Sequence, residues 1–145
     1  MSLLAPAAND QYRGARASAW FLALAGLLTL VPGMIHAFLP DGGAGSIAGL
    51  DMGDRRELVV ALFAWHGATQ IAYGLAMIVV ALRYRSLTPL FLALFVLERA
   101  LLTLNAWGPG AAAPSHRPPE HYGSLAGLAL GLVFLALSLR PRPGG

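Results

Sequence analysis

The chain has 145 residues, of which 57% are hydrophobic and 12% are charged, and its formal net charge is +3. Ordinary soluble domains contain roughly 45–50% apolar and about 25% charged residues, so this chain has too little charge to cover a water-soluble globule. The absence of cysteine excludes disulfides and thiol chemistry, and the scattered arginines form no basic patch with interleaved aromatics, so nucleic acid is not an expected partner.

Four apolar segments are long enough to cross a bilayer as helices. A membrane-spanning helix needs about 20 predominantly apolar residues. In chain order, the four segments cover residues 18–39, 58–82, 87–107 and 122–139. The sequence therefore predicts one all-α membrane domain over residues 1–145, a bundle of four transmembrane helices. The first segment is longer than the apolar core of a usual signal peptide, so we expect it to remain as a span.

Two of these segments begin with helix-start signals. Asp54 followed three residues later by Glu57 resembles a capping box. Thr88 followed by Pro89 is typical of an N-cap and the first helical residue. We therefore expect these residues to start helices, and no functional role is needed to explain them.

The stretch of residues 40–51, with the sequence PDGGAGSIAGLD, joins the first two segments. It follows a span instead of a strand and lacks the GxGxxG spacing of nucleotide-binding loops. We expect a flexible turn or a lid there.

The arginines divide unevenly between the two sides of a four-span topology. One side holds only three arginines, together with five acidic residues. The side that carries both termini holds six: Arg13, Arg16, Arg83, Arg85, Arg140 and Arg142. The positive-inside rule then places both termini in the cytoplasm and residues 40–57 and 108–121 outside. The use of arginine without lysine, together with abundant Ala, Gly and Pro, is typical of a GC-rich bacterial genome, so we expect a multi-pass protein of the bacterial inner membrane.

Small residues recur at helical spacing along two segments. Gly67 and Gly74 lie seven residues apart in the second segment, and Gly123, Gly127 and Gly131 lie four apart in the fourth. Such stripes let helix backbones approach closely. They predict either a tight four-helix bundle or a homodimer through the fourth segment.

Glu98 and Arg99 lie side by side in the middle of the third segment. An ionised side chain at the centre of a membrane helix costs on the order of 3 kcal/mol, so such residues usually face the interior of a bundle. Because neighbouring residues point about 100° apart around a helix, we expect direct pairing of the two to be poor. Candidate partners of Glu98 are His66 and Gln70, whereas Arg99 could reach Thr103, helix carbonyls or an anionic ligand. Glu98 could itself be a neutral acid, a proton carrier or half of an ion pair.

Other polar residues share helical faces at spacings of three, four and seven. If these faces converge, they line a funnel that opens to the outside and ends at the charged pair. The sequence therefore predicts a polar pocket lined by His36, His66, Gln70, Tyr73, Glu98, Arg99, Asn105 and His121.

Two classes of function fit this pocket. In the first, a membrane enzyme or transporter-like protein acts on a small ligand, anionic or lipid-like, with Glu98 for proton transfer, Arg99 for anion binding and His66 as a hydrogen-bonded partner. In the second, the chain is an accessory subunit of a larger membrane complex, and its polar core sets helix packing. The expected partners are membrane lipid, a small molecule, and a second copy or a larger complex.

His36 and His66 leave a third function open. Paired imidazoles on neighbouring helices can ligate haem or a transition metal, and His66 could also ligate a chlorophyll-type pigment. From the rise of about 1.5 Å per residue, however, the two histidines differ in depth by roughly 5 Å. The sequence therefore identifies no metal ligands, and the cofactor stays open.

Three short segments carry a family resemblance: AWHGATQ at residues 64–70, RYR at 83–85, and Glu98 with Arg99. Through them the chain resembles the small four-helix bacterial inner-membrane proteins grouped with the DoxX-like families. The resemblance implies a four-helix membrane architecture, and it carries over no catalytic residue.

Overall fold

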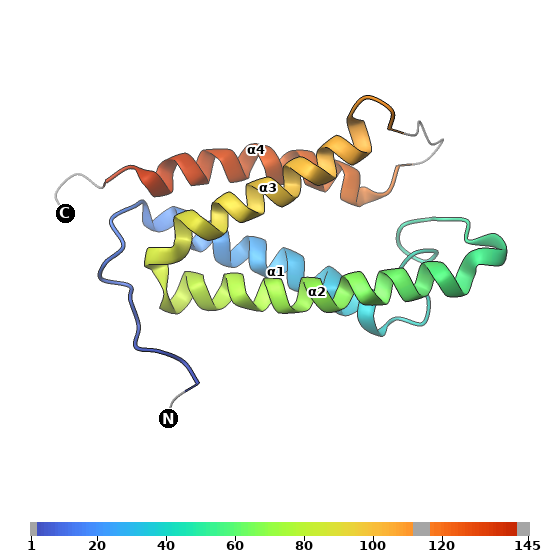
Figure 1. The fold of residues 1–145 in the computed structure, drawn as a ribbon, viewed down its shortest axis with the longest axis horizontal. Coiled ribbons are helices and arrows are strands. Elements are labelled where there is room, and N and C mark those ends of the chain that lie inside the picture. Colours follow the sequence, from blue (N-terminus) through green and yellow to red (C-terminus); the bar gives the residue numbers. More distant parts are fainter. Residues whose placement is uncertain (1–2, 112–116, 142–145) are drawn as a thin grey trace.

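The computed structural model describes residues 3–111 and 117–141, and these residues form helices joined by turns (Figure 1). The four long helices are α1 (Arg16–Phe38), α2 (Arg56–Arg83), α3 (Thr88–Trp107) and α4 (Pro119–Leu139). A short 3-10 turn precedes α2 at Gly53–Arg55 (η1) and another precedes α3 at Arg85–Leu87 (η2). The start of α1, the end of α4 and the α2–α3 turn lie at one end of the bundle, the terminal end. The α1–α2 connection, the end of α3 and the start of α4 lie at the other, the loop end.

Each of the four helices is long enough and apolar enough to cross a membrane. The helix of 20 residues in α3 is the shortest, and at about 1.5 Å per residue it matches a hydrocarbon core of about 30 Å. Over the described residues, the prediction of an all-helical chain with four helices long and apolar enough to cross a membrane is therefore confirmed, with boundaries within three residues of those expected. Of the arginines used to predict the orientation, Arg142 lies outside the described residues.

The expected helix caps do not form. No side chain caps α2, whose N-cap position is Arg55, so Asp54 and Glu57 make no capping box. Thr88 is the first residue of α3 instead of its N-cap, which is Leu87. In both cases a 3-10 turn leads into the helix, and the N-cap residue lacks the extended backbone that a capping side chain requires.

α1 and α2 run antiparallel with their backbones in direct contact (Figure 1). Glycines make this possible: Gly33 faces Gly67, and Gly26 faces Gly74 one repeat of seven residues away. A Cβ atom at position 67 would lie 2.7 Å from the carbonyl oxygen of Gly33, well inside van der Waals contact. The glycine stripe of the second segment therefore packs inside the chain, as the tight bundle predicts.

α3 and α4 form a second antiparallel pair that also depends on glycine. A Cβ atom at Gly127 would lie 3.0 Å from Cδ of Arg99, and one at Gly131 would lie 3.1 Å from Cδ1 of Phe95. A Cβ atom at Gly123, by contrast, would have no neighbouring atom within 4 Å. Two of the three glycines therefore serve packing within the chain, and a homodimer through α4 stays a prediction.

An apolar core joins the two pairs in the terminal half of the bundle. Its fully buried side chains are Leu22 of α1, Met77 of α2 and Leu92 of α3. The ring of Phe21 stacks on that of Phe134 of α4, with ring centroids 4.3 Å apart. From this half, α3 leaves α2 and crosses to lie along α4 (Figure 1).

The α1–α2 contact predicts that even one methyl group at Gly67 separates the helices. Gly67→Ala is expected to lower the free energy of unfolding by about 1–3 kcal/mol, the usual cost of overpacking. Gly123→Ala is the matched control, because it adds the same methyl group to a helix with open space around it. It should leave stability unchanged or raise it slightly. Thermal unfolding in detergent micelles compares the two, and equal effects would contradict the proposed contact.

Candidate functional site

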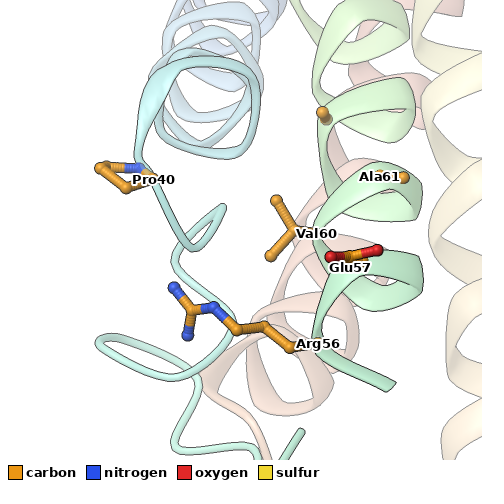
Figure 2. A pocket seen from close by; sticks show the side chains of 6 residues that line it. Pro40, Arg56, Glu57, Val60 and Ala61 are labelled. Atoms are coloured by element: carbon orange, nitrogen blue, oxygen red, sulfur yellow. The ribbon is translucent and has the colours of Figure 1, made fainter. Parts of the chain in front are cut away.

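A shallow groove of about 350 Å³ lies at the loop end, between α2 and the segment after α1 (Figure 2). It is lined by Pro40, Arg56, Glu57, Val60, Ala61 and Ala64. None of these residues belongs to the predicted pocket. The structure instead places the predicted site residues in two groups, one along the α3–α4 pair with neighbours on α2, and one on the α1–α2 pair.

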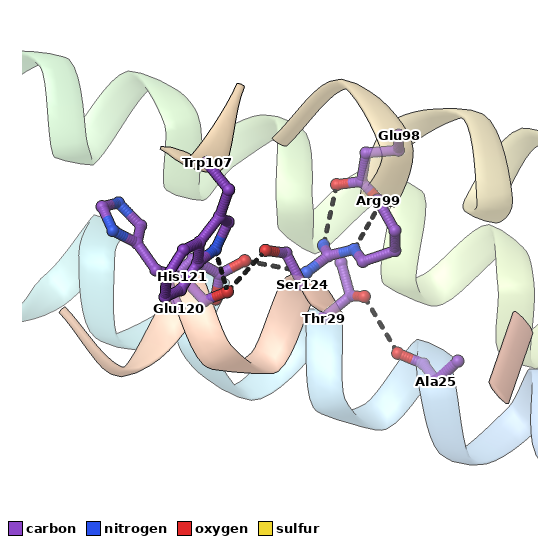
Figure 3. Close-up of polar contacts among 8 residues, drawn as sticks. All are labelled: Ala25, Thr29, Glu98, Arg99, Trp107, Glu120, His121 and Ser124. Atoms are coloured by element: carbon purple, nitrogen blue, oxygen red, sulfur yellow. Dashed lines mark hydrogen bonds and ion pairs between the residues drawn. The ribbon is translucent and has the colours of Figure 1, made fainter. Parts of the chain in front are cut away.

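The first group is centred on Arg99, whose guanidinium is held by two carboxylates (Figure 3). Its Nη2 lies 3.0 Å from Oε1 of Glu98, and its Nη1 lies 2.8 Å from Oε1 of Glu120. We call Glu98, Arg99 and Glu120 the ion cluster. The expectation that Glu98 and Arg99 pair poorly is therefore wrong. Their long side chains bend toward each other, so the angle between their Cα–Cβ directions does not decide the contact.

The seam between α3 and α4 determines where the guanidinium lies. Gly127 leaves room for the aliphatic part of Arg99, and the ring of Phe95 lies 5.4 Å from its Cζ atom. Arg99 is only 8% exposed, and its charged end reaches the first turn of α4, where Glu120 lies. A carboxylate there also interacts favourably with the positive end of the helix dipole.

Glu120 is the member of this cluster that sequence reasoning missed. The two prolines before it suggest a loop residue ahead of the fourth segment. In fact Pro119 is the first residue of α4, a position that proline fits well. The signal was its spacing of seven residues from Gly127, which places both on one helical face.

The charges of the ion cluster do not cancel. Two carboxylates surround one guanidinium, which leaves a net charge of −1 when both are ionised. The side chain of Glu98 is 29% exposed and that of Glu120 is 51% exposed, so both remain accessible. An anionic ligand at Arg99 would have to displace one of these carboxylates.

Tyr73 of α2 brings a further polar atom to this region, whereas Gln70 lies against α1, where a Cβ atom at Gly33 would meet Cβ of Gln70 at 2.9 Å. Tyr73 lies within electrostatic range of Glu98 and Arg99, and its ring stacks on Phe91 of α3. Its hydroxyl is buried without a hydrogen-bond partner among the described residues, as is Oε1 of Gln70. Leaving a buried polar atom unpaired costs about 1–3 kcal/mol, so these atoms are suited to a ligand or a water molecule.

At the loop end of this pair, His121 and Asn105 differ in their surroundings. The carbonyl of His121 accepts hydrogen bonds from Nε1 of Trp107 at 3.1 Å and from Oγ of Ser124 at 2.9 Å (Figure 3). Its ring atom Nδ1 is buried without a partner in the described part of the chain. Asn105 is exposed on α3.

The second group consists of His36 on α1 and His66 on α2. Their ring centroids lie 6.2 Å apart, and Nδ1 of His36 lies 2.7 Å from the carbonyl oxygen of Gly42. Within residues 3–111 and 117–141, no hydrogen bond or ion pair joins His66 to Glu98. The pairing of Glu98 with His66 or Gln70 is replaced by its pairing with Arg99.

The segment between α1 and α2 is folded by hydrogen bonds to the carboxylate of Asp41. The carboxylate accepts bonds from the backbone amides of Gly43 at 2.9 Å and Ser46 at 2.7 Å. These amides stabilise the charged form and lower the pKa of Asp41 to about 2. Gly42, with φ of 62°, adopts a backbone conformation that residues with a Cβ rarely take. The expected turn is therefore present as a set of hydrogen-bonded turns, while its flexibility and a role as a lid stay predictions.

Comparison with protein-family models, curated proteins and solved structures finds no match to this chain. Its class follows from the fold alone: residues 3–111 and 117–141 form an all-helical protein with four helices long and apolar enough to span a membrane. The resemblance to the DoxX-like families stays a prediction.

The carboxylate of Asp41 predicts how the α1–α2 segment responds to acid. Its pKa is lowered on folding, so its contribution to stability is complete above the ordinary value of 3.8 and is lost as the pH falls through about 2. The amide proton resonance of Ser46, followed by NMR in micelles, should therefore titrate with a midpoint near pH 2. Asp41→Asn should remove this titration. A midpoint near 3.8 in the wild-type protein would contradict the hydrogen bonding described above.

Proposed function

We propose that this protein is a membrane enzyme or transporter-like protein that binds a small ligand at the ion cluster, which lies between the middle of α3 and the first turn of α4. The observation that carries the proposal is the buried guanidinium of Arg99 between two carboxylates, beside the unpaired hydroxyl of Tyr73. These groups come from α2, α3 and α4, so a ligand there would contact three helices.

Packing alone gives little reason for such a cluster. Replacing buried ion pairs by well-packed apolar residues is often neutral or stabilising, because the charges must be removed from water. The α3–α4 seam already has Gly131 against Phe95, a contact that needs no charge. Intramembrane ionisable groups mark functional sites by default. The unpaired hydroxyl of Tyr73 adds a cost that a bound molecule or water would offset.

The net negative charge of the ion cluster favours a neutral or cationic ligand over the anionic ligand expected from the sequence. With Arg99 already paired, the groups left to recognise a ligand are the outer faces of two carboxylates and the hydroxyl of Tyr73. All of these can accept a hydrogen bond. We infer a lipid-like ligand with a neutral or cationic polar end that donates hydrogen bonds. Glu98 is the group for proton transfer, and Arg99 holds both carboxylates in place.

We further propose that the protein resides in the bacterial inner membrane with both termini in the cytoplasm. The four apolar helices support a multi-pass membrane protein. Arg13, Arg16, Arg83 and Arg85 gather at the terminal end, the side that the positive-inside rule assigns to the cytoplasm. The loop end, nearer the ion cluster, would then face outward.

A second candidate is an accessory subunit of a larger membrane complex. In the most apolar window of each span, between 17% and 28% of the residues are buried within the chain. Most of the apolar surface is therefore left for lipid or for neighbouring subunits. This surface is compatible with an accessory subunit, and also with a homodimer through α4. A partner that stays bound after purification would favour the second candidate.

The ligand proposal predicts a bound molecule that depends on Tyr73. Native mass spectrometry of gently purified protein should find a retained small molecule. Tyr73→Phe should lower its bound fraction at least fivefold, because the hydroxyl makes no bond within the described part of the protein. For the same reason, Tyr73→Phe should not destabilise the fold.

Tyr122→Phe is the matched control, since Tyr122 is 57% exposed at the start of α4. It should leave the bound fraction unchanged. If the wild-type protein retains no small molecule, or if Tyr73→Phe and Tyr122→Phe retain it equally, the ligand site is not at the ion cluster. Co-purification of a fixed partner protein would then support the accessory subunit.

The proposed orientation predicts which single cysteines an impermeant reagent reaches in intact cells. Asp54→Cys lies at the loop end and Arg140→Cys at the terminal end, and both positions are exposed. With no native cysteine to interfere, Asp54→Cys should be labelled once the outer membrane is permeabilised, and Arg140→Cys only after cell lysis. Labelling in the reverse order would overturn the orientation.

A further inference from the structure

We propose that His36 and His66 bind a transition-metal ion at the loop end of the α1–α2 pair. This site lies outside the ion cluster, so the inference goes beyond the proposed function. The two ring centroids are 6.2 Å apart. Two imidazoles that share one ion place their centroids about 5–6.5 Å apart, because each metal–nitrogen bond is about 2.0–2.1 Å long. The rings therefore already lie at the separation that a shared ion needs.

The ring of His36 is oriented as a metal ligand. Its Nδ1 lies 2.7 Å from the carbonyl oxygen of Gly42. A carbonyl oxygen only accepts hydrogen bonds, so Nδ1 carries the proton and Nε2 keeps its lone pair. Metal-binding histidines usually show this arrangement, in which the second nitrogen donates to a carbonyl. The ring of Phe63, with its centroid 5.0 Å away, packs edge-on against the imidazole and fixes it further.

His66 provides the second nitrogen. Its side chain is exposed, and its imidazole has no hydrogen-bond or ion-pair partner among residues 3–111 and 117–141. Its neighbour Gly67 brings α1 close, because a side chain there would meet Cβ of His36 at 2.9 Å. The same glycine contact that packs the helices therefore brings the two imidazoles together.

The surroundings favour a bare ion over haem or a pigment. Gly33 and Gly67 hold the two backbones in contact one turn below the rings, which leaves no width for a macrocycle between them. Within the described residues, no group of three His, Cys, Asp or Glu side chains lies together. Two imidazoles would thus share the ion with water. Imidazole suits Cu²⁺, Ni²⁺ and Zn²⁺, and Cu²⁺ binds most tightly in this series.

Cu²⁺ titration of protein purified in micelles without a polyhistidine tag tests the site. Electron paramagnetic resonance should report one Cu²⁺ per chain with couplings to imidazole nitrogen. His36→Ala and His66→Ala should each raise the Kd at least tenfold. Because His66 is exposed and holds nothing else in place, His66→Ala decides the question even if His36→Ala misfolds.

His121→Ala is the matched control, a histidine at the same end of the bundle but on α4. It should leave Cu²⁺ binding unchanged. The proposal is overturned if the wild-type protein binds no more Cu²⁺ than the His36→Ala/His66→Ala double variant, or if His121→Ala weakens binding as much. Tyr73→Phe should not change Cu²⁺ binding, so failure of this site and failure of the ligand site are distinguishable.

Discussion

The structure depends on backbone contact between helices at glycine. In a bilayer, apolar side chains gain little by leaving lipid, so helices associate where their backbones approach closely. Gly33 and Gly67 provide this contact for α1 and α2, and Gly127 and Gly131 provide room for side chains of α3 at α4. Each helix pair therefore depends on a few positions where a side chain would overlap atoms of the neighbouring helix.

The polar groups lie next to these glycines for the same reason. Arg99 extends along the space that Gly127 leaves, and His36 lies against Gly67. Where two backbones approach closely, each helix helps to shield a polar side chain beside the contact from lipid. The glycines therefore both pack the bundle and position its ionisable groups, so a glycine substitution would disturb stability and site geometry together.

How much of this the sequence revealed depends on the kind of interaction. The number of helices and their bounds follow from hydropathy and length, which are properties of single segments. The sequence predicts all four helices, with bounds within three residues of those in the structure. Which charged groups meet depends on side-chain torsions and on the neighbouring helix. The pairing of Glu98 with Arg99 was therefore missed, and so was the role of Glu120. The expected pocket likewise assumed that three polar faces converge, whereas His36 and His66 lie on one helix pair and the ion cluster on the other.

The division into two pairs has a mechanical consequence. Over the described residues, the ring contacts and hydrogen bonds between the pairs lie in the terminal half and involve Ala15, Ser18, Phe21, Tyr73 and their partners. At the loop end, each pair is instead held together internally, α3 to α4 by Trp107 on the carbonyl of His121 and α1 to α2 by the backbone contact of Gly33 with Gly67. Separation of the pairs at the loop end would therefore break few specific contacts. A ligand of the proposed kind would reach the ion cluster with least resistance from that end, while the apolar core keeps the helices in register.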